Sequence, residues 1–301
     1  MAAALPDPGV YHDITDAVYR ALPYANFSHI KLYADSPARA QHVAKHGMKQ
    51  TPAMFLGEML HCMVLERHEF PNRFELWDGA DRELKNGSVK RIIGTDTPEY
   101  RERLEDATQR GVRLYGVKEQ GELLGMSQAV AASSDAVRIL DSPTITTEVV
   151  VIWDDAKTGV RCKAKIDFAN FSARVCGDLK SAQSAAPEAF GRTVAQMYYH
   201  AQAAMYSDAL DAFHPGGWAW KWIAVEKSKD SEGENPMHAV GVYDADVEAL
   251  EIGRHFYRKW LAMHKRCTDD GRWPSYGATA IALPAWHVRQ VEDAIYEEVT
   301  G

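Results

Sequence analysis

The sequence has few cysteines, no long apolar run and no excess of positive charge. Its four cysteines, Cys62, Cys162, Cys176 and Cys267, include no C-x-x-C pair, which favours buried reduced thiols over disulfides or a zinc site. No apolar run is long enough to span a bilayer. The first residues also lack the charged and apolar regions of a secretion signal. We therefore expect a cytoplasmic protein with no membrane partner.

The net charge of −8 at pH 7 excludes a chain that is basic over its whole surface. It does not exclude a nucleic-acid-binding protein, because only the surface that faces the phosphates must be positive. With 301 residues, of which 46% are hydrophobic, the chain can bury a substantial core as one large domain or two small ones.

The stretch 160–180 is where chemistry-bearing residues concentrate. It predicts two short strands joined by a tight turn around residues 170–173. If the strands pair there, Asp167 and Asp178 lie close together on one face, with Lys180 beside them. Two carboxylates and an ammonium are costly to crowd together. A divalent cation such as Mg²⁺ or Mn²⁺ would stabilise them, and the lysine could orient or deprotonate a water for attack on a phosphodiester. The alternative is a surface hairpin with solvated charges.

The remainder of the chain predicts a mixed sheet flanked by helices, an α/β fold in the broad sense. We expect one domain over residues 1–301, with a loose arm (1–12), a loop and helical insertion (71–143), a central sheet (144–243) and C-terminal helices (244–301). Helix starts are indicated at Ser28, Ser36, Thr51 and Pro284, and one long helix begins at Pro187. A further helix should be capped by Asp244 or Asp246.

Several side chains outside the hairpin are candidates for the same site. Gly57 and His61 share one side of the helix that starts at Thr51, although a lone helical histidine is more often a satisfied core residue. On the helix after Pro187, Tyr199, Gln202 and Tyr206 form a stripe that is usually core packing. Gln202 within it needs a polar partner, such as a catalytic lysine or a phosphate.

Two further features leave their roles open. Glu148, on the first predicted strand of the sheet, is either a third carboxylate of the site or a structural residue. The polar segment with Lys85, Lys90 and Arg91 is either a loop that reaches toward a phosphate backbone or an ordinary solvated loop.

Four motifs in order resemble a known family. They are G-x-x-x-H at 57–61, Asp167 at the end of a strand, D-x-K at 178–180 and Q-x-x-x-Y at 202–206. This series resembles the RecB-like branch of the PD-(D/E)XK nuclease superfamily, with its restriction-endonuclease-like core. The residues that surround the motifs, together with R-W-P-S-Y and L-P-A-W near the end, are similar to the sequences of RecE-type exonucleases (the exodeoxyribonuclease VIII family).

The resemblance implies the roles of individual residues. His61, Asp167, Asp178 and the backbone carbonyl of Leu179 would bind Mg²⁺, for which Mn²⁺ would substitute. Lys180 would be the catalytic lysine, supported by Gln202 and Tyr206. Ile166 stands where relatives often have proline, and the scattered cysteines lack the tight group that holds an iron–sulfur cluster in some relatives. We therefore expect no cluster.

The resemblance also implies an activity and partners. A bacterial or phage-encoded exonuclease would digest linear double-stranded DNA, 5′ to 3′, and leave 3′ single-strand tails for recombination. It would form a homo-oligomeric ring, typically a tetramer, and work beside a single-strand annealing protein. The competing interpretations are a non-catalytic ring that binds DNA ends and an endonuclease on the same fold.

Overall fold

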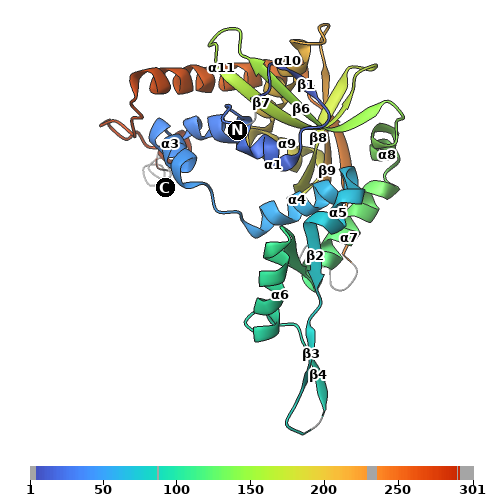
Figure 1. The fold of residues 1–301 in the computed structure, drawn as a ribbon. Coiled ribbons are helices and arrows are strands. Elements are labelled where there is room, and N and C mark those ends of the chain that lie inside the picture. The colour runs from blue at the N-terminus through green and yellow to red at the C-terminus, as the bar shows by residue number, and fades with distance from the viewer. Residues whose placement is uncertain (1–4, 87, 229–235, 290, 292–301) are drawn as a thin grey trace, which may run out of the picture.

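A six-stranded sheet forms the centre of the molecule in this computed structural model, which describes residues 5–86, 88–228, 236–289 and 291 (Figure 1). The strand order is β1-β6-β7-β8-β9-β10, and only β8 and β9 are parallel neighbours. The strands are β1 (Gly9–Tyr11), β6 (Ile145–Asp154), β7 (Arg161–Asn170), β8 (Val175–Ala182), β9 (Ala219–Glu226) and β10 (Val240–Asp244). The predicted mixed α/β sheet is confirmed. The predicted loose arm is wrong at residues 9–11, which pair with the edge of β6.

The strands β7 and β8 separate after a short stretch of pairing, and this split creates the central opening of the fold. Their ladder covers three residue pairs, ending at Phe168 and Gly177. Beyond that point, β8 continues beside β9 over its whole length, while Ala25 bridges to Cys162 on β7. Polar groups of the diverging strands are therefore free to face one another.

Helices lie between β1 and the remaining strands of the sheet in the chain. They are α1 (Asp16–Ala21), α2 (Phe27–Ile30), η1 (Lys31–Ala34), α3 (Pro37–His46), α4 (Pro52–Leu65), η2 (Arg67–Glu69) and α5 (Phe70–Arg73). The side chains of Ser36 and Thr51 accept hydrogen bonds at the starts of α3 and α4, which confirms both predicted caps. The cap predicted at Ser28 is wrong, because Asn26 accepts the His29 N–H at 2.9 Å and Ser28 lies inside α2.

The segment 71–143 contains strands that the predicted loop and helical insertion did not include. β2 (Phe74–Trp77) pairs in parallel with β5 (Arg113–Gly116), and β3 (Ala80–Glu83) forms a hairpin with β4 (Val89–Ile92). The helices α6 (Pro98–Gln109), α7 (Val117–Ala132) and α8 (Ser134–Leu140) complete the segment. The β3–β4 hairpin projects away from the central sheet (Figure 1).

The sheet has an apolar core on each face. One core joins the sheet to α9 (Pro187–Gln196), α10 (Tyr199–Asp211) and α11 (Val247–Asp270), and the other joins it to α4, α5 and α7. The single long helix predicted from Pro187 is interrupted, because Tyr198 adopts a left-handed φ of 58° between α9 and α10. Asp246, one of the two predicted caps, begins α11.

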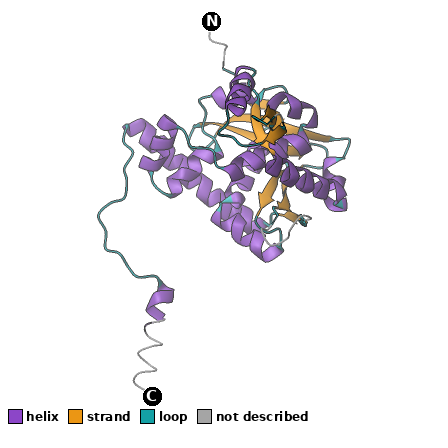
Figure 2. Ribbon diagram, turned by 90° about the horizontal axis from the view of Figure 1, so that it is seen from below, coloured by secondary structure: helices purple, strands orange, loops and turns teal. Residues whose placement is uncertain are grey.

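After α11, Trp273 still packs on the core and the Pro274 carbonyl accepts the Ala38 N–H, and the chain then leaves the body (Figure 2). It runs without regular structure from residue 272 to 284 and then forms a short helix over 285–289, as predicted from Pro284. The rest of the predicted C-terminal helix lies outside the described residues. All four cysteines are buried and free, and no helix among the described residues is both long and apolar enough to cross a membrane.

Candidate metal and nuclease site

The opening between β7 and β8 brings the two predicted aspartates together. The Asp167 carboxylate accepts the backbone N–H of Leu179 at 2.7 Å, so a side chain continues the contact where the strand ladder ends. Asp178 precedes this residue on β8, and both aspartates are buried. Burial raises the pKa of Asp178 to about 6, as does the charge of Asp167.

His61 reaches this opening from α4. Its Nδ1 lies 3.3 Å from the Asp167 carboxylate, and its Nε2 lies 2.5 Å from the Leu179 carbonyl oxygen. Both ring nitrogens face acceptors, an arrangement that suits the doubly protonated imidazolium. Burial lowers the pKa of His61, but the Asp167 carboxylate outweighs it and raises the value to about 9. The same ion pair holds the pKa of Asp167 below its usual range despite burial.

Lys180 extends from β8 toward α10. Its ammonium forms an ion pair with Asp178 and lies 3.4 Å from the side-chain oxygen of Gln202. The Gln202 amide donates to Asp178 at 3.0 Å, so the glutamine bridges the acid and the lysine. The Lys180 ammonium also stands 4.6 Å from the ring centre of Tyr199. Gln202 thus has the polar partners that its position on the helix required.

Tyr206 lies one turn further along α10 and is buried. Its ring packs edge-on against Phe27 and Trp220. Burial raises the pKa of its hydroxyl well above the usual value, an effect that Gln202 partly offsets. The stripe Tyr199, Gln202 and Tyr206 therefore combines core packing with contacts to the Asp178–Lys180 pair.

Glu148 joins the opening from β6. Possible ligand atoms of His61, Glu148 and Asp167 all lie within 4.8 Å of one another. The Glu148 backbone has a left-handed φ of 56°, which costs about 1–3 kcal/mol for a residue with a side chain and is frequent at functional positions. The Glu148 carboxylate forms an ion pair with Lys165 of β7. Burial and the Asp167 charge raise the pKa of Glu148 to about 7.

An imidazole nitrogen with two carboxylates is a donor set that divalent cations accept. The residues present therefore fit a metal ion. Of the ligands predicted from the sequence, His61, Asp167 and the Leu179 carbonyl meet at one point, whereas Asp178 turns toward Lys180 and Gln202. Glu148 lies where a third carboxylate of the site would lie. This is one of the two roles that the sequence left open for it.

Two further cations were not predicted. Lys165 contacts Glu148 and also Asp16 of α1, at 3.0 Å. Lys31 of η1 is half-buried with its ammonium 5.8 Å from the Phe27 ring centre. Its pKa is lowered by burial and then by the nearby charge of Lys180. No ion pair of Lys31 occurs within the described part of the chain.

The basic segment singled out in the sequence lies elsewhere. Lys85, Lys90 and Arg91 belong to the β3–β4 hairpin and its turn, which points away from the sheet (Figure 1). Arg91 pairs with Asp78 at 2.7 Å and Asp81 at 3.3 Å. Gly57, in turn, lies over β8, where an added Cβ would meet the Ser181 hydroxyl at an ordinary 3.5 Å.

A split mixed sheet with acids on two diverging strands and a lysine after the second acid defines a PD-(D/E)XK-like fold. Residues 26–282 match the family described as "PDDEXK-like domain of unknown function (DUF3799)", and the chain belongs to that family. Among solved structures, it resembles the crystal structure of a protein named "Putative exonuclease" from Eubacterium rectale. The TM-score is 0.55 at 10% identity, over 91% of this chain and 97% of the other. A comparison with curated proteins gave no significant match.

These comparisons agree with the superfamily that the motifs predict. The structural likeness is one of fold, because the two sequences share only 10% of their residues. The narrower likeness to RecE-type exonucleases stays a prediction.

Proposed function

We propose that this protein is a metal-dependent deoxyribonuclease, with residues 1–301 acting as one nuclease domain. The observation that carries the proposal is the meeting of His61, Asp167 and the Leu179 carbonyl at the strand split. An Asp178–Lys180 pair lies beside it. The family match over residues 26–282 supports it, since the fold and the motifs coincide in one region.

His61, Asp167, Asp178 and the Leu179 carbonyl would hold Mg²⁺, with the Asp178 carboxylate exchanging its contacts to Lys180 and Gln202 for the cation. Mn²⁺ would bind more tightly because of the imidazole ligand. When bound, such a cation polarises the phosphoryl oxygen and stabilises the charge that develops there. Lys180 would orient the attacking water. Burial lowers the pKa of Lys180, but the Asp178 carboxylate outweighs burial and raises it, so the lysine would help the deprotonation as a cation that stabilises the hydroxide and would not itself accept the proton. Gln202 contacts both the Lys180 ammonium and the Asp178 carboxylate, and Gln202 and Tyr206 would support the lysine and the DNA strand.

The finer activity rests on the resemblance to RecE-type enzymes. We propose digestion of linear double-stranded DNA from 5′ ends, which leaves 3′ tails for a single-strand annealing protein. We further propose that the protein forms a ring-shaped homo-oligomer, typically a tetramer. It would be a cytoplasmic protein that is encoded by a bacterium or a phage.

The test uses duplex DNA labelled at one 5′ or 3′ end and a covalently closed circle, each with Mg²⁺ or with EDTA. The proposal predicts Mg²⁺-dependent loss of the 5′ label as mononucleotides and an intact circle. Rapid loss of the circle would instead indicate an endonuclease. Binding of DNA ends without cleavage by the wild-type protein would indicate the non-catalytic ring.

A further inference from the structure

Each acid of the opening has its own cation in this structure. Asp167 pairs with His61, Asp178 with Lys180, and Glu148 with Lys165. The first two pairs belong to the predicted motifs. The third pair joins residues on β6 and β7 to which no motif assigned a role.

Lys165 differs from Lys180 because it contacts two acids from different parts of the chain. One is Glu148 at the site, and the other is Asp16 of α1, whose carboxylate lies 3.0 Å from the Lys165 ammonium. The side chain of Lys165 is only 16% exposed. An ammonium so placed is costly to leave without a partner.

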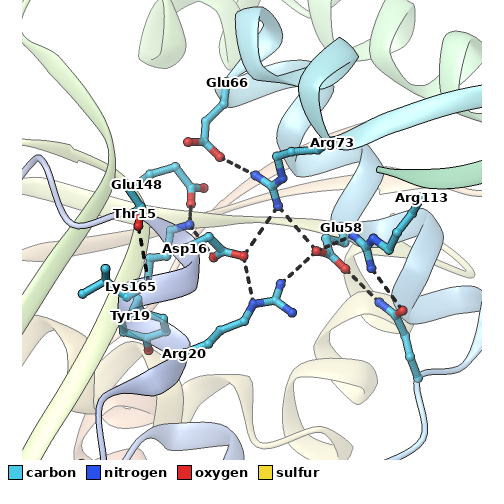
Figure 3. A network of polar contacts seen from close by, with 12 residues as sticks. Thr15, Asp16, Tyr19, Arg20, Glu58, Glu66, Arg73, Arg113, Glu148 and Lys165 are labelled. Atoms are coloured by element: carbon cyan, nitrogen blue, oxygen red, sulfur yellow. Dashed lines mark hydrogen bonds and ion pairs between the residues drawn. The ribbon is translucent and has the colours of Figure 1, made fainter. Parts of the chain in front are cut away.

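Asp16 is fixed from its other side, as the close-up shows (Figure 3). Arg20 contacts it at 2.8 Å and Arg73 at 3.8 Å. Both arginines also bind Glu58, at 2.8 Å and 3.4 Å. Asp16 therefore stays in place when Lys165 changes its other contact.

We propose that Lys165 is a built-in counterion of the metal site. When Glu148 ligates a divalent cation it releases the Lys165 ammonium, and Asp16 then retains that ammonium. The inference rests on the proposed function, because it concerns the same site. Glu148 becomes a further carboxylate ligand beside His61 and Asp167, consistent with their possible ligand atoms lying within 4.8 Å of one another. Lys165 and Asp16 are positioning residues that set how tightly the site binds metal.

The arrangement predicts opposite effects for two neighbours. Without the Lys165 ammonium, Glu148 has no competing cation, so Lys165→Met should tighten Mn²⁺ binding by about tenfold. Without the Asp16 carboxylate, Lys165 would be left unpaired on release, so Asp16→Asn should weaken binding by about threefold. In the double variant the effect of Asp16→Asn should disappear, because there is no ammonium left to retain.

The experiment is a titration of Mn²⁺ into the DNA-free protein, followed by calorimetry or by the electron paramagnetic resonance of free Mn²⁺. The variants are Lys165→Met, Asp16→Asn, the double variant and Glu148→Gln, which should weaken binding. Lys165→Gln replaces Lys165→Met if that protein does not fold. Glu58→Gln is the matched control, since it removes a carboxylate from the same network without touching Lys165, and its affinity should stay within about twofold of wild type.

The outcomes separate this inference from the proposed function. Failure of the wild-type chain to bind Mn²⁺ overturns both. Wild-type binding together with weaker or unchanged binding by Lys165→Met overturns the counterion alone. So does an Asp16→Asn effect that persists at full size in the double variant, because that result reports only a general loss of negative charge.

Discussion

Metal binding should release a proton from His61. Both ring nitrogens of His61 face acceptors, at 3.3 Å and 2.5 Å, and its pKa is raised to about 9. A metal ligand must offer a nitrogen without a proton, so metal and proton compete for the ring. At pH 8 about nine-tenths of His61 carries the extra proton, whereas Glu148, with a pKa of about 7, is largely ionised. About one proton should therefore leave for each metal ion bound.

Metal affinity should rise with pH because the pKa of His61 is raised. The folded protein holds the His61 proton until the pH rises through about 9, so metal affinity should increase with pH up to that value, by about tenfold per unit from pH 7.5 to 8.5. Calorimetry of Mn²⁺ binding at pH 8, in buffers of different ionisation enthalpy, counts the released protons directly.

The matched control is His68→Gln, which changes a histidine whose side chain is 79% exposed and lies outside the opening. It should release the same number of protons as wild type, whereas His61→Gln should release close to none. If His61→Gln binds too weakly to titrate, wild-type release should still fall to about one half at pH 9. Zero release by the wild-type protein, or full release by His61→Gln, would refute the assignment of His61.

Three further outcomes follow from the structure. In the metal-free protein, the His61–Asp167 ion pair contributes stability that is fully present below pH 6.5 and lost as the pH rises through about 9. Denaturant unfolding should therefore show that His61→Gln is less stable than wild type by about 2 kcal/mol at pH 6.5. At pH 9.5 the two proteins should be much closer in stability. Gly253→Ala should lower the melting temperature and cost at least about 2 kcal/mol, because an added Cβ would lie 2.2 Å from the His200 carbonyl oxygen and force α10 and α11 apart. Gly191→Ala should leave the melting temperature unchanged, because its Cβ would meet nothing within 4 Å. Equal effects of the two substitutions would contradict the close packing of α10 and α11. Lys31→Met should weaken DNA binding in Ca²⁺ and reduce the slope of its salt dependence by about one, because the Lys31 ammonium feels the charge of Lys180 and forms no ion pair within the described residues that would keep it from a phosphate. The exposed Lys118 is the control and can be changed without this effect. An unchanged slope would show that Lys31 makes no phosphate contact.

The sequence predicts the sheet well because its strands carry strong signals. The hairpin of β7 and β8 alternates, and the register places Asp167 near Asp178 as expected. Helix starts at Ser36, Thr51 and Asp246 follow from capping chemistry that needs only neighbouring residues. These features depend on local rules, which a single sequence expresses directly.

Other parts depend on contacts that are distant along the chain. The break at Tyr198 is set by tertiary packing, since the ring lies against Phe256 and Trp260 of α11. The β3 and β4 strands are polar and exposed, so they lack the apolar alternation that marks a strand.

The same holds within the candidate site. A sequence can suggest that Lys165 points to the same side of its strand as Asp167. It cannot show that Asp16, far earlier in the chain, forms an ion pair with Lys165. Likewise, the split of β7 and β8 decides that Asp178 turns to Lys180 while Glu148 approaches His61. The resemblance carried by the motifs implied Asp178 as a metal ligand, and the sequence left the role of Glu148 open.

The most direct test of the central claim is cleavage of end-labelled linear duplex by the wild-type protein, Lys180→Ala and Asp178→Ala, with Mn²⁺ affinity measured on the same preparations. We predict metal-dependent cleavage by wild type, no cleavage but nearly normal metal binding by Lys180→Ala, and loss of both by Asp178→Ala. Normal cleavage by either variant would contradict the assignment of this opening as the nuclease site.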